Sequence, residues 1–207
     1  MIRIAIVGDI GSGKSHISRQ FGYPVFNADD QVADLYKNSR KCFLKLKKAI
    51  PDYISSYPIK KDEITSAILS NQSNIKKIIK IVHPLVSSKM NNFIRRNKNK
   101  KIIILDIPLL IENKINKKDD VLIFIDAKKK EINKKLKKRH NINLKIVKIF
   151  RKLQLPIEVK KKKSNFIIKN NFNDNYTKKN VKKILKEILF NDWNYTWYWN
   201  HRFISHR

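Results

Sequence analysis

The stretch Gly8-Asp9-Ile10-Gly11-Ser12-Gly13-Lys14-Ser15 decides the fold of this chain. It matches the P-loop pattern, and it lies between an apolar run that predicts a strand and a segment that predicts a helix. Glycines let successive backbone N–H groups turn inward around a phosphate, where the start of the helix adds positive potential. We predict that Lys14 bridges the β- and γ-phosphates of ATP and that the Ser15 hydroxyl ligates Mg²⁺. The alternative is a glycine-rich turn without a ligand.

The composition makes this loop more informative. Lys, Ile and Asn, all read from A/T-rich codons, supply 93 of the 207 residues, whereas there are only four glycines. Three of the four lie in the loop, where a missing Cβ is needed. The predicted nucleotide-binding residues are Asp9, Ile10, Gly11, Ser12, Gly13, Lys14, Ser15 and His16.

The charge is strongly positive, with 47 basic and 17 acidic residues and a net charge of +30. Such a balance usually suggests nucleic acid. The lysines are spread along the chain, so we favour a solvated basic surface, whose field would also attract a phosphate-rich small substrate.

Other composition features exclude several classes of protein. The single Cys42 excludes a disulfide framework and a cysteine-rich zinc site. No run approaches the roughly 20 apolar residues of a membrane helix, and no secretory signal is evident. We expect a cytoplasmic protein without a membrane partner, either a monomer or a weak homo-oligomer.

Strands alternate with helices along the chain. Short β-branched apolar runs predict strands, and segments with apolar residues three or four apart predict helices. This alternation predicts an α/β fold with a doubly wound parallel sheet of about five strands and helices on both faces. The predicted strands are 2–7, 24–27, 101–105, 121–125 and 166–168, and the predicted helices of the core are 16–21, 31–36 and 181–190.

Two helical regions interrupt this alternation. Residues 40–96 predict a helical insertion, in which Asp62-Glu63 begin an amphipathic helix and helical spacing continues to His83-Pro84. Residues 129–163 predict a basic helical lid, broken near Asn141 and at Pro156. We therefore predict one domain over 1–192, with a core of 1–39, 97–128 and 164–192 and a tail of 193–207. We expect the tail, which holds all three tryptophans, to pack on the domain; a partner-binding or base-stacking strip is the alternative.

Two aspartates follow predicted strands, at the sheet edge where ligands bind in parallel sheets. Asp29 could accept a proton from an attacking hydroxyl or orient it, and Asp106 could hold Mg²⁺ through water. The alternatives are that Asp29 or Asp30 caps the next helix and that Asp106 caps its strand.

The sequence Asn116-Lys117-Lys118-Asp119 matches the guanine-reading pattern of GTPases. In GTPases the motif follows a strand, whereas here it precedes one. We therefore interpret it as a chance match in a chain rich in Asn and Lys.

Several segments together resemble dephospho-CoA kinase, the family that catalyses the last step of coenzyme A synthesis. The P-loop resembles that family's Gly-Gly-Ile-Gly-Ser-Gly-Lys-Ser, with Asp9 in place of a glycine. The match covers about residues 2–190 in order and spacing. The further segments are Val25-Phe26-Asn27-Ala28-Asp29, His83-Pro84-Leu85-Val86, Asp106-Ile107-Pro108-Leu109-Leu110-Ile111-Glu112, Gln154-Leu155-Pro156-Ile157-Glu158-Val159-Lys160 and Phe166-Ile167-Ile168-Lys169-Asn170.

The resemblance implies that ATP phosphorylates the ribose 3′-hydroxyl of dephospho-CoA. It makes Asp29 the acid that activates the hydroxyl and Lys14 the cation that neutralises the phosphates. It implies that Arg139 and Lys160 are lid groups closing on phosphates, and that His83 and Asp106 belong to the substrate site.

The sequence departs from the family pattern at several positions. Asn27 and Lys169 stand in place of acids, His140 follows Arg139 in place of an aspartate, and Phe172 replaces a glycine. Arg151 is one position away from the expected arginine before Gln154. The alternatives are a related nucleoside monophosphate kinase and a nucleic-acid-binding protein that uses ATP as a switch.

Overall fold

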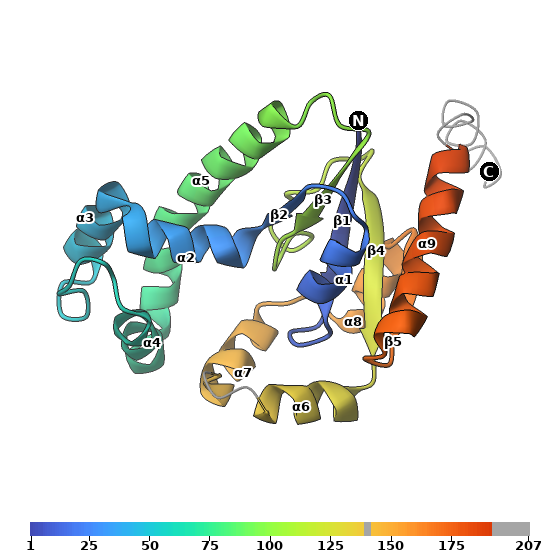
Figure 1. The fold of residues 1–207 in the computed structure, drawn as a ribbon. Coiled ribbons are helices and arrows are strands. Elements are labelled where there is room, and N and C mark those ends of the chain that lie inside the picture. The colour runs from blue at the N-terminus through green and yellow to red at the C-terminus, as the bar shows by residue number, and fades with distance from the viewer. Residues whose placement is uncertain (139–141, 192–207) are drawn as a thin grey trace, which may run out of the picture.

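The computed structural model describes residues 1–138 and 142–191, which contain one five-stranded parallel sheet (Figure 1). The spatial order of the strands is β2-β3-β1-β4-β5, so the sheet confirms the predicted doubly wound α/β fold. The strands are β1 (Ile2–Gly8), β2 (Val25–Asn27), β3 (Ile102–Asp106), β4 (Val121–Ala127) and β5 (Phe166–Asn170).

Alternate side chains of the strands separate two apolar layers. In β1, Ile4 and Ile6 face α1 (Lys14–Gln20) and α9 (Asp174–Asn191), whereas Ala5 and Val7 face the opposite layer. β1 is therefore buried on both faces, which explains its uninterrupted apolar sequence.

The predicted insertion has a core of its own. It is built by α3 (Arg40–Ala49), α4 (Lys61–Ser70) and the first half of α5 (Gln72–Arg96). Helix α2 (Ala28–Asn38), which the prediction assigned to the core at 1–39, packs with them, and these helices extend to the left in Figure 1. Leu46, Ile54 and Ala67 are fully buried in this core. Cys42 lies there too, and burial raises the pKa of its thiol to about 11, which disfavours the thiolate form.

Helix α5 joins the insertion to the sheet. The sequence predicted helical spacing up to His83-Pro84, but the helix continues through Pro84 to Arg96. A proline inside a helix removes one hydrogen bond and crowds the carbonyl four residues earlier, and apolar packing of the second half of α5 opposes this cost. Met90, Phe93 and Ile94 pack against the sheet, and the Phe93 ring lies 5.6 Å from that of Phe26.

The basic region contains three helices with different contacts. α6 (Lys129–Lys137) and α7 (Leu144–Lys152) share a small apolar cluster of Ile132, Leu136 and Val147. α8 (Ile157–Lys163) instead contacts β1 and β4 of the sheet. The predicted lid thus comprises a part that packs on the core and a part beside the insertion.

Two predictions fall on residues that the structure does not describe. Arg139 lies outside the described residues, and so does the tryptophan-containing tail at 193–207. Within residues 1–138 and 142–191, no helix combines the length and apolarity that crossing a bilayer requires.

Candidate active site

The P-loop lies between β1 and α1, as predicted. Gly11 and Gly13 adopt φ angles of 83° and 92°, which glycine reaches without strain. The Ser12 carbonyl accepts a hydrogen bond from Asn170 Nδ2 at 2.8 Å, and a Cβ on Gly13 would collide with that same amide nitrogen. Asn170, at the end of β5, therefore fixes the shape of the loop.

The Lys14 ammonium is folded back onto its own loop. Its Nζ donates to the carbonyl oxygens of Asp9, at 2.9 Å, and Gly8, at 3.3 Å. Burial lowers the pKa of Lys14, and the negative charge of Asp106 partly opposes this. Lys14 thus stands within the loop, where a nucleotide phosphate would replace the carbonyl partners.

Asp106 ends β3 and is almost completely buried, with 2% of its surface exposed. Asn27 Nδ2 donates to Asp106 Oδ2 at 2.7 Å, and the Ser15 side chain lies close enough to the same carboxylate to lower its pKa. Burial raises the pKa of Asp106, whereas Ser15 and Lys14 oppose the rise. Ser15 and Asp106, the two predicted Mg²⁺ residues, therefore lie in contact.

Asp29 is the second residue of α2, just beyond the end of β2. The cap of α2 is Asn27, whose Oδ1 accepts from the Asp30 N–H at 2.9 Å, so the alternative in which Asp29 or Asp30 caps this helix is wrong. Desolvation by the surrounding protein raises the pKa of Asp29, and Asp106 adds to the rise.

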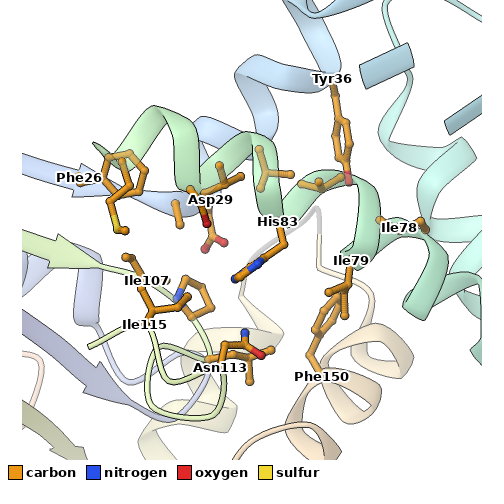
Figure 2. Close-up of a pocket in the computed structure, with 18 residues that line it drawn as sticks. Phe26, Asp29, Tyr36, Ile78, Ile79, His83, Ile107, Asn113, Ile115 and Phe150 are labelled. Carbon is orange, nitrogen blue, oxygen red and sulfur yellow. The ribbon is translucent and has the colours of Figure 1, made fainter. Parts of the chain in front are cut away.

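A mostly apolar pocket of about 230 Å³ opens beside Asp29 (Figure 2). Core, insertion and lid each contribute to its wall, through residues such as Phe26, Ile78 and Phe150. Figure 2 shows the Asp29 carboxylate and the His83 imidazole pointing into the same space. Among the described residues, the buried His83 Nε2 has no hydrogen-bond partner, so a ligand in the pocket could supply one.

Lys160 lies under the P-loop and not on a projecting lid. It belongs to α8, and only 2% of its surface is exposed. Its Nζ donates to Gln154 Oε1 at 2.8 Å and to the Gly8 carbonyl at 3.4 Å, and it lies 3.5 Å from Glu112 Oε1. Burial lowers the pKa of Lys160, whereas Glu112 raises it. The packing of α8 on the sheet places this ammonium at the loop, and a closing motion of Lys160 onto phosphates stays a prediction.

Arg151 of α7 also reaches the P-loop. Its guanidinium binds Asp9 through two contacts, Nε to Oδ1 at 3.2 Å and Nη2 to Oδ2 at 3.1 Å. In the sequence, Arg151 is recognisable only as an arginine displaced by one position from the family pattern. The two residues are 142 positions apart, and no local pattern relates them.

Two remaining sequence predictions concern peripheral groups. His16 lies at the surface, where its Nε2 contacts Asp174 Oδ1 at 2.8 Å and a side chain of its own helix. Residues 116–119 precede β4, whose first residue pairs with Ile4 of β1. They therefore lie at the sheet edge opposite the P-loop, where they cannot read a base of a nucleotide bound there.

Comparisons with known proteins agree with this geometry. The family model for dephospho-CoA kinase matches residues 2–175. The chain is 31% identical over 193 residues to a dephospho-CoA kinase of Wolbachia pipientis wMel, covering 91% of this chain and 98% of that protein. It is 30% identical to one from Bartonella quintana (strain Toulouse), with the same coverage.

Solved structures show the same fold. The protein TT1252 from Thermus thermophilus is 25% identical with a TM-score of 0.72, over 91% of this chain and 96% of that one. A dephospho-CoA kinase from Campylobacter jejuni has a TM-score of 0.59 at 22% identity, over 90% of this chain and 96% of that one.

Proposed function

Because this chain belongs to the dephospho-CoA kinase family, we propose that it transfers the γ-phosphoryl group of ATP to the ribose 3′-hydroxyl of dephospho-CoA, giving coenzyme A and ADP. The observation that carries the proposal is the position of Asp29. Its carboxylate stands between the P-loop edge of the sheet and a pocket able to receive the acceptor. A kinase requires this relation between the donor and acceptor sites.

In the proposed mechanism the P-loop holds the triphosphate and Asp29 faces the acceptor hydroxyl. The hydroxyl oxygen forms a bond to the γ-phosphorus, the bond from that phosphorus to the bridging oxygen breaks, and the proton passes to Asp29. The raised pKa of Asp29 suits a base, because a more basic carboxylate takes a proton more readily. Lys14 offsets the charge on the phosphate oxygens.

Ser15 and Asp106 would hold Mg²⁺ at this site. A hydroxyl beside a buried carboxylate fits this ion, which prefers oxygen ligands and binds through few protein groups together with phosphates. When bound, Mg²⁺ neutralises charge on the phosphate oxygens. A cation there would also reduce the electrostatic repulsion between the Asp29 and Asp106 carboxylates, each of which has a raised pKa.

We propose that His83 binds the acceptor. Its imidazole projects from α5 into the pocket, and its unpaired Nε2 can exchange a hydrogen bond with a polar group of dephospho-CoA. We also propose that core, insertion and lid together form the acceptor site, because residues of all three line the pocket. A cytoplasmic location and a monomeric or weakly associating state stay predictions.

The test is a coupled ADP-release assay with the purified chain. We expect turnover to require dephospho-CoA, and AMP, CMP or dTMP should not replace it. Turnover with a nucleoside monophosphate in its place would identify the related nucleotide kinase. ATP hydrolysis stimulated by polynucleotide, with salt-sensitive binding of that polynucleotide, would identify the nucleic-acid-dependent switch.

A further inference from the structure

Cationic side chains converge on the first residues of the P-loop, and each already has hydrogen-bond partners in the protein. Lys14 donates to the carbonyl oxygens of Gly8 and Asp9, and Lys160 lies between Gln154, Glu112 and Gly8. Arg151 differs from both lysines, because its main partner is a carboxylate of the loop itself. The ion pair between Arg151 and Asp9 has no role in the proposed reaction.

The Asp9 carboxylate occupies the donors that a phosphate group would use. Its Oδ1 accepts the Ile10 N–H at 2.6 Å and Arg151 Nε at 3.2 Å, while Oδ2 accepts Arg151 Nη2 at 3.1 Å. A backbone N–H of a P-loop and a two-pronged guanidinium are typical phosphate ligands. Arg151 Nη2 also lies 3.5 Å from the Ile10 carbonyl, so the guanidinium rests directly on the loop.

The backbone of α7 is held independently of this ion pair. Ile146, Ile149 and Phe150 pack against the insertion core, and Val147 packs against α6. Phe150, the residue before Arg151, lines the acceptor pocket. Breaking the ion pair would therefore free a side chain without releasing the helix, and Arg151 would stay within reach of the loop.

From these contacts we infer that Asp9 acts as an internal substitute for a phosphate group: it positions Arg151 on the P-loop, and ATP phosphate oxygens replace its carboxylate when nucleotide binds. This inference rests on the proposed function, since it assumes that the loop binds ATP. Arg151 is then a phosphate-binding residue of the loaded enzyme, and Asp9 is a positioning residue that competes with the nucleotide. A stronger ion pair between Asp9 and Arg151 would therefore weaken the binding of ATP.

The test is a double-mutant cycle on ATP binding, measured by calorimetry without acceptor. Asp9→Asn keeps the shape of the side chain and an oxygen for the Ile10 N–H but removes the charge. We expect it to lower the Kd for ATP by about three- to tenfold. Arg151→Ala should raise the Kd by roughly tenfold, because phosphate loses a ligand.

The double variant Asp9→Asn with Arg151→Ala separates competition for Arg151 from simple charge repulsion. Asp9 also repels phosphate through its charge alone, and that effect would persist without Arg151. If Arg151 is the partner for which carboxylate and phosphate compete, Asp9→Asn should change the Kd by less than about twofold in the Arg151→Ala background. An equal gain in both backgrounds, or a loss of affinity in Asp9→Asn alone, would overturn the inference.

Two controls keep the readout specific. Lys152→Ala removes a charge from the neighbouring exposed position on α7 and should leave the Kd for ATP nearly unchanged. Arg151→Lys keeps the charge but not the two-pronged geometry, so it should recover only part of the affinity. The cycle needs no turnover, so a chain that binds ATP but does not phosphorylate dephospho-CoA would refute the proposed function and leave this inference testable.

Discussion

At the scale of single residues, Asp29 has the most specific role in the proposed reaction. Asp29→Asn keeps the size of the side chain but leaves nothing to take the proton of the acceptor hydroxyl. We expect kcat to fall by about 10²- to 10⁴-fold, with ATP affinity little changed. Steady-state kinetics and a separate measurement of ATP binding check this. A variant that loses ATP affinity but keeps its maximal rate would instead make Asp29 a binding residue.

Lys14 is expected to act on the phosphates and not on the fold. Its ammonium donates to two backbone carbonyls, and both are part of the loop. Lys14→Ala should therefore abolish turnover while the far-UV circular dichroism and the thermal midpoint stay close to those of the parent. Rates like those of the parent would remove the P-loop assignment.

The sequence predicted the site residues that follow local patterns. The glycines and Lys14 have a fixed spacing, and Asp29 and Asp106 follow apolar strands, so both could be placed at one sheet edge. The sequence did not predict that Asn170 and Arg151 contact the P-loop. Their contacts with the loop span 158 and 142 positions, and only the packed structure brings such pairs together.

At the scale of elements, hydrogen bonds of Glu63 connect the start of α4 to the preceding loop. Its carboxylate accepts hydrogen bonds from the backbone N–H groups and hydroxyls of Ser55 and Ser56, and from the Lys60 N–H. Desolvation pushes the pKa of Glu63 upward, but the hydrogen bonds outweigh it and lower the pKa to about 2. From the sequence we predicted only that Asp62-Glu63 begin an amphipathic helix here.

This pKa predicts a pH-dependent contribution to stability. The folded value of about 2 lies below the unfolded value of 4.5, so the stabilisation is complete above 4.5 and is lost as pH falls toward 2. Glu63→Gln should lower the free energy of unfolding by about 1–2 kcal/mol at neutral pH. The difference from the parent should shrink below pH 4.5, as measured by urea unfolding at several pH values.

The control for this prediction is Asp52→Asn, which changes an exposed carboxylate near the same loop. It should shift stability by less than about 0.5 kcal/mol at any of these pH values. A difference between Glu63→Gln and the parent that stayed constant down to pH 2 would contradict the assigned role of the carboxylate.

Phe172 shows how an element can keep a backbone shape after losing the residue that suits it. The resemblance places a glycine at this position, and Phe172 adopts φ 62°, a left-handed conformation that glycine reaches freely. The Phe172 N–H donates to Asn170 Oδ1, and the ring lies 5.3 Å from Lys135 Nζ. Asn170 thus contacts the turn after β5 through its Oδ1 and the P-loop through its Nδ2.

At the scale of the whole molecule, the acceptor pocket is lined by residues of the core, the insertion and the lid. Ser87 lines it from α5, whereas the next residue, Ser88, is exposed outside it. Ser87→Phe should fill the pocket and raise the KM for dephospho-CoA by about tenfold or more, with ATP affinity unchanged. Ser88→Phe is the matched control and should behave like the parent. Equal effects of the two variants would place the acceptor elsewhere.

The arrangement of the three parts was only partly predictable. Strand runs and their alternation with helices predicted the sheet, and the polar helical block at 40–96 predicted the insertion. The sequence did not show that α5 would pass through Pro84 and reach the sheet, because the packing of Met90 and Phe93 on the core decides this. Nor did it separate α8, which contacts the sheet, from the rest of the lid.

The position of β1 at the middle of the sheet has a consequence for how the chain is made. Ile2 pairs with Ile102 and Ile4 pairs with Val121, so β1 is synthesised about a hundred residues before either of the strands that pair with it. The insertion core draws mainly on side chains between residues 35 and 86, which emerge together. Because nearby contacts form faster than distant ones, we expect the insertion to fold co-translationally while the strand that precedes the phosphate loop is still unpaired.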